Sequence, residues 1–275
     1  MGALATILII IGALLLIVAA SFIFCIFPRV KHPQKTSLMV ETKFAHRGLH
    51  DSEKPENSLA AFGAAVENGY GMELDIHLTR DGRLAVMHDN NVKRMCGVDL
   101  LVSENDFSAL SDLRLAGSGE HIPAFEEVLA LVDGKTPLCV ELKADKGNAK
   151  ALCAAAFELL DSYKGDYCVE SFDPRCLCWM KHNRPEIVRG QLACKIKKQG
   201  EKFPRLLGFI LTNLLMNHLS RPDFVAYDHS RGEPFALKVS RFFGAKIFWW
   251  TVRSEEKGKE LLAGGDTIIF EKFKA

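Results

Sequence analysis

Short apolar runs alternate with longer helical patterns along the chain after about residue 42. Runs of strand type lie near 43–46, 71–76, 84–88, 137–142, 166–171, 187–192, 223–227 and 246–251. Patterns of helical length lie at 57–68, 124–132, 147–163, 174–182, 204–219, 234–243 and 254–263. This alternation is typical of βα units around a parallel sheet. Eight strands favour closure, so we predict an α/β fold with a TIM-type (β/α)8 barrel over residues 42–275.

Two segments depart from a regular βα repeat. Only "HLTRDGR" separates the second and third runs, and its Asp81-Gly82 pair signals a turn, so this segment is either a hairpin or an extended return. Residues 90–121 form a polar insertion with one short helical pattern, and an excursion of that length is often a lid or a wall of a site. At the helix starts, Ser254 can cap the last helix, and Asn57 can either cap the first helix or serve a functional site.

The first 27 residues contain no Asp, Glu, Lys, Arg or His. About 20 apolar residues are enough to cross the hydrocarbon core of a bilayer. A cleavable signal peptide has a shorter apolar core and a small-residue cleavage site, whereas this run ends in bulky Phe22, Phe24 and Phe27. We therefore predict an uncleaved transmembrane anchor at 1–27 and a juxtamembrane linker at 28–41.

The charges and cysteines of the chain indicate on which side of the membrane the globular domain lies and which partners it binds. Four basic residues and one acid lie between Pro28 and Lys43, and basic flanks prefer the cytoplasm. The chain after the anchor has seven cysteines, an odd number without framework spacing, which suits a reducing compartment. We expect a single-pass membrane protein with its globular domain facing the cytoplasm. The net charge of +1 makes nucleic acid an unexpected partner.

Ionisable residues gather at the predicted carboxyl ends of the strands, which meet at one mouth of a barrel. Glu73 and Asp75 are two apart in a strand, so their side chains share a face. Together with Glu141 from another strand, they form an oxygen-rich site whose mutual repulsion a cation would relieve. Because thiol and imidazole ligands are not clustered in the sequence, we favour Mg²⁺ or Ca²⁺ over zinc.

Two histidines and two cations follow the same strands. His46 and His88 can act as an acid and base pair, one taking a proton from the attacking oxygen and the other giving one to the leaving oxygen. Arg47 offers a planar donor fork for phosphate, and Lys143 offers a compact positive charge. Phosphoryl transfer depends on positioning and on neutralising charge, so this set predicts a phosphodiesterase.

At this point the chain resembles the glycerophosphodiester phosphodiesterase family. The matching segments are "AHRG" at 45–48, "PENSLAAF" at 55–62, "MELDIHLTRDGRLAVMHD" at 72–89, "VELK" at 140–143, "ESFDP" at 170–174 and "WWTV" at 249–252. They follow the family pattern in order and spacing over nearly all of the soluble part. The resemblance implies a phosphodiesterase barrel that uses a divalent metal to hydrolyse a glycerophosphodiester to glycerol 3-phosphate and an alcohol.

The resemblance also implies roles for individual residues. His46 and His88 match the catalytic histidines, Glu73, Asp75 and Glu141 the metal ligands, Arg47 and Lys143 the phosphate-binding positions, and Trp250 a tryptophan of the mouth. Either a glycerol hydroxyl attacks first to give a cyclic phosphate or water attacks directly. The segment "GGDTIIFEKF" at 264–273 departs from the family, because Phe270-Glu271 stands where Thr-Asp is common. Asp266 is retained, but the resemblance leaves any contact from that segment unassigned.

One further apolar segment bears on the substrate. "PRLLGFILTNLLMNHL" at 204–219 is too short to span a bilayer. It is either an outer barrel helix with a buried stripe or a surface that touches the membrane or a lipid chain at the mouth. An anchored domain makes a lysophospholipid a second candidate substrate, with lysophospholipase D-type hydrolysis. A catalytically silent lipid-binding protein is the remaining alternative.

Overall fold

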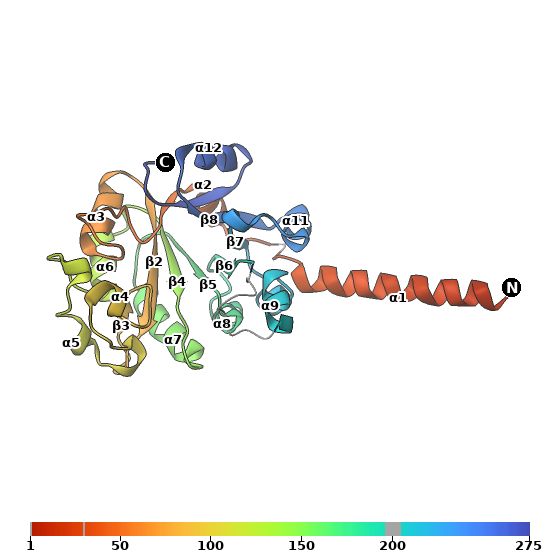
Figure 1. Cartoon of the computed structure of the whole chain (residues 1–275), viewed down its shortest axis with the longest axis horizontal. Helices are drawn as coiled ribbons and strands as arrows, with labels where there is room; N and C mark the ends of the chain where they lie inside the picture. The colour runs from red at the N-terminus through yellow and green to blue at the C-terminus, as the bar shows by residue number, and fades with distance from the viewer. Residues whose placement is uncertain (1, 30, 196–204) are drawn as a thin grey trace.

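The computed structural model describes residues 2–29, 31–195 and 205–275 (Figure 1). The first residue of the predicted anchor, Val30 of the linker and the start of the predicted helix at Pro204 lie outside these ranges. Within them, eight parallel strands follow one another in the order β1, β2, β4, β5, β6, β7, β8 and β9, and β1 pairs with both β2 and β9. This pairing closes the sheet and confirms the predicted TIM-type barrel.

The barrel strands are short and mostly buried. They are β1 (Phe44–Ala45), β2 (Gly71–Leu78), β4 (Leu138–Leu142), β5 (Tyr167–Ser171), β6 (Arg189–Ala193), β7 (Phe224–Asp228), β8 (Lys246–Val252) and β9 (Thr267–Phe270). Seven of them fall on predicted runs. The predicted run at 84–88 is not a barrel strand, because β3 (Leu84–Val86) pairs antiparallel with β2. The Asp81-Gly82 segment is thus a hairpin, and the eighth barrel strand is β9, which the apolar pattern missed.

The predicted helices form with small changes at their ends. They are α3 (Leu59–Glu67), α6 (Phe125–Val132), α7 (Ala149–Leu160), α8 (Pro174–Asn183), α11 (Phe235–Phe242) and α12 (Glu255–Ala263). Ser254 caps α12 by accepting a hydrogen bond from the backbone N–H of Lys257, as predicted. The long helix predicted at 204–219 is wrong in length. It divides into α9 (Arg205–Thr212) and α10 (Asn217–Ser220), because Leu214 adopts a positive φ of 58° that an α-helix cannot contain.

The start of α3 also differs from the prediction. Ser58 is its N-cap, and the Ser58 Oγ accepts a hydrogen bond from the backbone N–H of Ala61. Asn57 has a φ of 57° and donates from Nδ2 to Asp75 Oδ2 at 2.8 Å. Asn57 therefore holds a residue of the predicted metal site instead of capping the helix.

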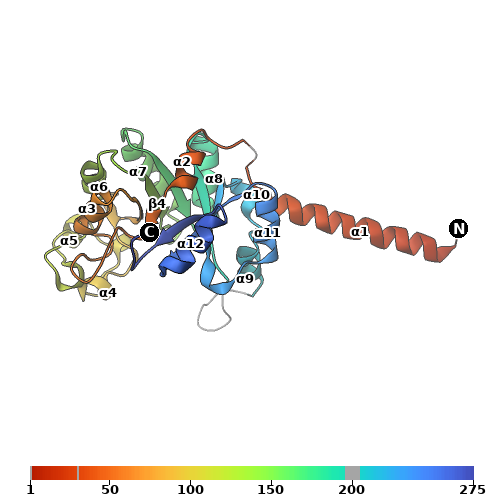
Figure 2. The ribbon, with the colours of Figure 1, turned by 90° about the horizontal axis from the view of Figure 1, so that it is seen from above.

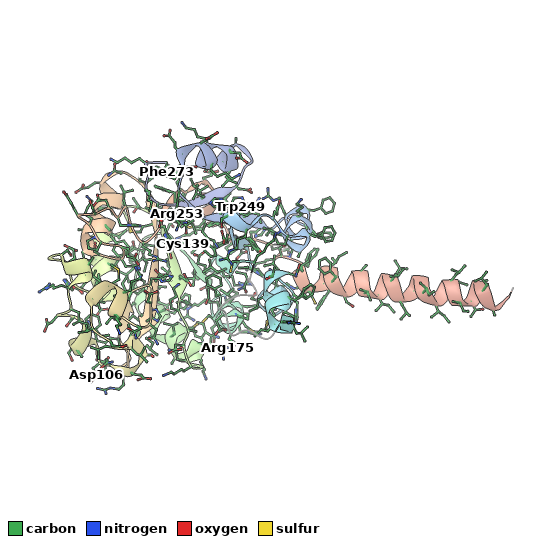
Figure 3. All side chains as sticks on the ribbon, in the orientation of Figure 1. Asp106, Cys139, Arg175, Trp249, Arg253 and Phe273 are labelled. Atoms are coloured by element: carbon green, nitrogen blue, oxygen red, sulfur yellow. The ribbon has the colours of Figure 1, made fainter. Side chains whose placement is uncertain are left out.

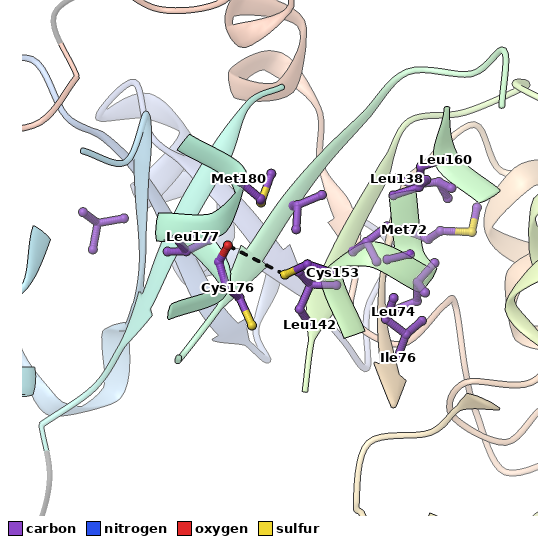
Figure 4. Close-up of a cluster of buried hydrophobic side chains, with 14 of the residues drawn as sticks. Met72, Leu74, Ile76, Leu138, Leu142, Cys153, Leu160, Cys176, Leu177 and Met180 are labelled. Carbon is purple, nitrogen blue, oxygen red and sulfur yellow. Dashed lines mark hydrogen bonds between the residues drawn. The ribbon is translucent and has the colours of Figure 1, made fainter. Parts of the chain in front are cut away.

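Alternation along β2 separates an apolar face from an ionisable one. Met72, Leu74 and Ile76 pack in the layer between the strands and the outer helices (Figure 4). Glu73 and Asp75 point to the opposite side, as their spacing predicts. The bottom of the barrel interior is filled by a separate apolar cluster that includes Phe44, Cys139, Phe224 and Phe248. The acidic residues thus lie above a closed apolar floor.

The insertion at 90–121 is a compact wall beside the barrel. It contains α4 (Lys93–Cys96), α5 (Phe107–Leu110) and the short 3-10 turns Val102–Glu104 and Leu115–Gly117. Val92, Phe107 and Leu110 belong to a small core of its own that also contacts β3. The wall reaches the site through Arg94, whose contacts are given below.

The N-terminal helix α1 (Ala3–Ile26) projects away from the barrel (Figures 1 and 2). Its side chains stand free along most of its length (Figure 3). It is the one helix in the described part of the chain that is long and apolar enough to cross a membrane. Only its last turns pack on the barrel, where Ile26 is fully buried and Phe22 stacks on Phe235 at 6.1 Å. The following helix α2 (Thr36–Glu41) closes the barrel floor with Met39.

Candidate active site

Three buried carboxylates from two neighbouring strands form the centre of the candidate site. Glu73 and Asp75 lie on β2, and Glu141 lies on β4 directly opposite Asp75 in the strand register. One oxygen atom from each of the three carboxylates lies within 4.8 Å of the others, an arrangement that could hold a metal ion. Lys143 extends from the end of β4, with its Nζ 3.0 Å from Asp75 Oδ1 and 2.8 Å from Glu141 Oε2. The structure thus brings together the acids that the sequence predicted as metal ligands.

Burial and mutual repulsion disfavour the charged form of the carboxylates in this cluster. Burial raises the pKa of Glu73 well above its ordinary value, and the charges of Asp75 and Glu141 add to the shift. Burial raises the pKa of Glu141 to about 7, although the neighbouring Lys143 opposes the shift. The cluster contains a fourth acid that the sequence reasoning missed. Glu170 on β5 lies opposite Glu141 in the strand register, and its pKa is raised by burial and by the Glu141 charge.

His46 is held by a carboxylate that follows the last strand of the barrel. Its Nδ1 lies 2.7 Å from Glu271 Oε2, and Glu271 directly follows β9. Burial lowers the pKa of His46, although the hydrogen bond to Glu271 opposes the shift. Burial alone would raise the pKa of Glu271, but its hydrogen bonds with His46 and His50 lower it well below its ordinary value. The segment whose contacts the resemblance left unassigned therefore supplies the partner of His46.

His88 is held in a similar way by its neighbour in sequence. Its Nδ1 lies 2.7 Å from Asp89 Oδ1, which leaves Nε2 available. Burial lowers the pKa of His88 to about 4, against the opposing effect of the Asp75 charge. His77, on the same face of β2 as the acids, lies with its Nε2 3.0 Å from the carbonyl oxygen of His88 and so supports the backbone at that position.

Arg47 connects the first strand to the acids and to the insertion. Its backbone N–H donates to Glu73 Oε2 at 2.9 Å, and its Nη1 donates to Glu56 Oε1 at 2.7 Å. Glu56 also accepts from Arg94 Nη2 at 2.7 Å, and Arg94 Nε donates to Asp89 at 2.5 Å. The two arginines and Glu56 thus form one network that runs from His46 to the partner of His88. Arg94, which lies in the insertion, was not among the residues predicted from the sequence.

The two adjacent tryptophans point to opposite sides of β8. Trp250 packs against the apolar cluster inside the barrel, and its ring meets Phe172 edge-on at 5.7 Å. Trp249 lies on the outer side, where its Nε1 donates to Asp266 Oδ2 at 2.8 Å (Figure 3). The strand alternation predicted one ring inward and one outward, and the inner ring is that of Trp250.

Comparison with known proteins places this barrel among enzymes that hydrolyse phosphate diesters. A sequence model of the glycerophosphoryl diester phosphodiesterase family matches residues 46–272, which is nearly all of the barrel. The chain belongs to this family. The family predicted from the sequence is therefore confirmed, and so is the class of enzyme, a phosphoric diester hydrolase.

Two kinds of relative are similar to this chain. A glycerophosphodiester phosphodiesterase of Caldanaerobacter subterraneus subsp. tengcongensis is 30% identical over 241 residues, which cover 82% of this chain and 91% of that protein. Lysophospholipase D GDPD1 of Rattus norvegicus is 31% identical over 160 residues, 54% of this chain and 49% of that protein. The match thus covers about half the length of the rat lysophospholipase D.

Solved structures show the same fold. A phosphodiesterase of Oleispira antarctica, solved in complex with the product sn-glycerol-3-phosphate, superposes with a TM-score of 0.72 at 23% identity, covering 86% of this chain and 94% of that one. A glycerophosphodiester phosphodiesterase of Thermotoga maritima superposes with a TM-score of 0.63 at 26% identity, covering 82% of this chain and 92% of that one.

Proposed function

We propose that this protein is a metal-dependent glycerophosphodiester phosphodiesterase that releases glycerol 3-phosphate and an alcohol. The observation that carries the proposal is the cluster of Glu73, Asp75 and Glu141, three carboxylates buried together at the carboxyl ends of barrel strands. Burying carboxylates side by side is costly unless positive charge lies among them. A site for a cation explains why the fold keeps them there.

The donor set fits a hard divalent ion. Glu141 Oε1 and the nearby Glu170 Oε2 are buried and have no hydrogen-bond partner among the described residues. Carboxylate oxygens are the ligands that Mg²⁺ and Ca²⁺ prefer. Glu73, Asp75 and Glu141 would hold the ion, and when bound it would polarise a phosphoryl oxygen and neutralise developing charge. Both ions remain candidates.

Two cations of the chain would bind the phosphate. Arg47 and Lys143 are about 85% buried at their side chains, and each contacts Asp75. Burial alone would lower the pKa of Lys143, but the charges of Asp75 and Glu141 raise it above its ordinary value, so the ammonium stays charged. A buried permanent charge interacts strongly with a phosphate because little water screens it.

The two histidines would move the protons. Glu271 and Asp89 each hold an Nδ1, and this leaves an Nε2 on each ring for the substrate. A neutral His88 can accept a proton from the attacking oxygen or from water, and the second imidazole can donate one to the leaving alcohol. A glycerol hydroxyl and a water molecule are both possible nucleophiles in this arrangement. In the net reaction water is consumed and the phosphorus–oxygen bond to the alcohol breaks.

The second candidate is lysophospholipase D-type hydrolysis, in which the same bond is broken in a substrate that keeps one acyl chain. Two observations favour it: the similarity to the rat lysophospholipase D and the apolar helix α1. We propose that α1 is a single-pass membrane anchor and that the barrel faces the cytoplasm. Anchoring would raise the local concentration of membrane lipids around the site.

One experiment tests the proposed function. The wild type and His46→Ala are assayed for alcohol release from a panel of glycerophosphodiesters and lysophospholipids, with Mg²⁺, with Ca²⁺ and with EDTA. We expect the wild type to be active with one of the metals, EDTA to abolish that activity, and His46→Ala to reduce it to a small residual rate. A wild type without activity in either metal would favour a silent lipid-binding protein instead.

A further inference from the structure

An apolar cavity of about 610 Å³ lies beside the barrel mouth. It is bounded by the segment after β5, the start of α8, the end of β6, and α9 with α10. Its apolar lining includes Phe172, Leu192, Leu207, Ile210, Leu211 and Met216. This volume falls in the range of roughly 300–1,000 Å³ that small-molecule sites occupy in proteins.

The charges of the lining are already balanced. Asp173 and Arg175 are its charged residues, and they pair with each other at 2.6 Å. Gln191 Oε1 and Asn217 Nδ2 also belong to lining residues, and both atoms are buried without a hydrogen-bond partner in the described part of the chain. A neutral, apolar wall with two unsatisfied amide atoms suits a hydrocarbon chain that carries a few polar groups at its head.

One end of the cavity reaches the candidate active site. Phe172 lines it and also meets Trp250, the inner tryptophan of the mouth, at 5.7 Å. Gln191 lines it and donates from Nε2 to the carbonyl oxygen of Ser171 at 3.1 Å. Ser171 directly follows Glu170, the fourth acid of the buried cluster. The cavity therefore begins beside the same strand ends that carry the acids.

The other end lies beside the proposed anchor. Met216 and Asn217 line the cavity at the start of α10, and α10 contacts α1. The ring of His218 lies 5.8 Å from that of Phe24, and Arg221 donates to the Phe24 carbonyl oxygen at 2.8 Å. Both views show α9 and α11 on the side of the barrel from which α1 projects, and Figure 2 shows α10 there as well (Figures 1 and 2).

The outer face of α9 is apolar as well. Leu206 is 70% exposed and Phe209 is 60% exposed, and both stand on the helix whose other side lines the cavity. Large exposed apolar side chains beside a membrane-spanning helix are suited to contact with the acyl region of a bilayer. The cavity thus adjoins the mouth at Phe172 and the proposed anchor at α10.

We propose that this cavity binds the acyl chain of a lysophospholipid while its phosphate occupies the site between Arg47 and Lys143. The inference rests on the proposed function and makes a monoacyl glycerophosphodiester its preferred substrate class. The acyl chain stays on the glycerol side, so the bond that breaks is again the one between phosphorus and the leaving alcohol.

The test uses the full chain in nanodiscs with the metal that supports activity. Alcohol release is measured for glycerophosphocholine and for lysophosphatidylcholines with acyl chains of six, eight and ten carbons, which dissolve as monomers. Each methylene removed from water contributes about fourfold to binding at most. We expect kcat/KM to rise at least about tenfold from six to ten carbons.

Variants of α9 distinguish binding of the acyl chain in the cavity from partitioning of the substrate into the membrane. Ile210→Trp fills the cavity, and Leu207→Gln makes its wall polar without filling it. We expect both to lower kcat/KM for the ten-carbon substrate about tenfold and to leave glycerophosphocholine hydrolysis unchanged. Phe209→Trp, on the exposed face of the same helix, is the matched control and should change neither.

The outcomes distinguish this inference from the proposed function. A flat chain-length series in an active wild type overturns the cavity assignment and leaves the phosphodiesterase intact. Equal losses on both substrates in Ile210→Trp and Leu207→Gln, or no loss on either, also overturn it. A wild type that hydrolyses none of these substrates with either metal contradicts the proposed function itself.

Discussion

Replacing Glu271 by glutamine tests how His46 is held. Glu271 Oε2 lies 2.7 Å from His46 Nδ1, and its pKa is lowered well below its ordinary value, so the residue is a carboxylate throughout the working pH range. A carboxylate at Nδ1 directs Nε2 toward the substrate, and it stabilises the imidazolium form of His46 that donates a proton to the leaving alcohol. The neutral amide introduced by Glu271→Gln keeps the size of the side chain but loses this charge.

The magnitude follows from the kind of hydrogen bond that is lost. A hydrogen bond to a charged group contributes about 1.5–3 kcal/mol. If that energy is expressed in the transition state, kcat falls by about ten- to a hundredfold. Glu271 has no contact with Arg47 or Lys143 in the structure as described, so KM should change little. Glu271→Asp keeps the charge and should retain more activity than Glu271→Gln.

The assay is steady-state hydrolysis of the preferred glycerophosphodiester, together with thermal unfolding of each variant. Glu255→Gln, an exposed acid on α12 paired with Lys259, is the matched control and should leave kcat unchanged. In a His46→Ala background, Glu271→Gln should have no further effect, because the two residues act as a unit. An unchanged kcat in the single variant, or a full additional loss in the double variant, would refute the reasoning.

Three further predictions concern the metal, the base and the anchor. Glu73→Gln should weaken metal binding and activity together, and calorimetric titration with unchanged metal affinity would count against its role as a ligand. Burial lowers the pKa of His88 from 6.5 to about 4, so the ring stays unprotonated and able to accept a proton until the pH approaches 4. The acid limb of the kcat/KM profile should therefore lie below pH 6.5. A limb above that value would assign the base to another residue. Deleting residues 2–20 should leave a soluble, active barrel. Deleting residues 2–27 should also lower the melting temperature of the barrel, because it removes the buried Ile26. Equal melting temperatures of the two deletion variants would show that the last turn of α1 contributes nothing to stability.

The fold could be predicted from the sequence because most of the barrel strands are short runs of mainly apolar residues. β2, β4 and β7 each carry a nearly continuous pattern of buried residues. The miscount at β3 arose because an apolar run of three residues looks the same in a hairpin as in a barrel. β9 was missed because four residues after the last helix become a strand only by pairing with both β1 and β8.

The candidate site was predictable where residues share a strand and not where distant segments meet. The spacing of Glu73 and Asp75 was enough to place them on one face. The partnership of His46 with Glu271 joins residues 225 positions apart, and no local pattern encodes it. Glu170 lay inside a quoted motif, and its strand-end position beside Glu141 was an available signal. The role of Asn57 stayed open between a helix cap and a residue of the site, because an Asn at a helix start suits both, and only its contact with Asp75 decides.

The pairing of β1 with β9 has a consequence for how the enzyme is made. His46 lies just after the first barrel strand, and its carboxylate partner Glu271 lies just after the last one. A chain cut short before that point could fold most of its helices and hold every metal-ligand candidate, yet its first histidine would lack a fixed orientation. Full catalytic competence therefore arrives only when the segment after β9 has been synthesised and docked, so the last strand of the barrel completes a site that the first strand begins.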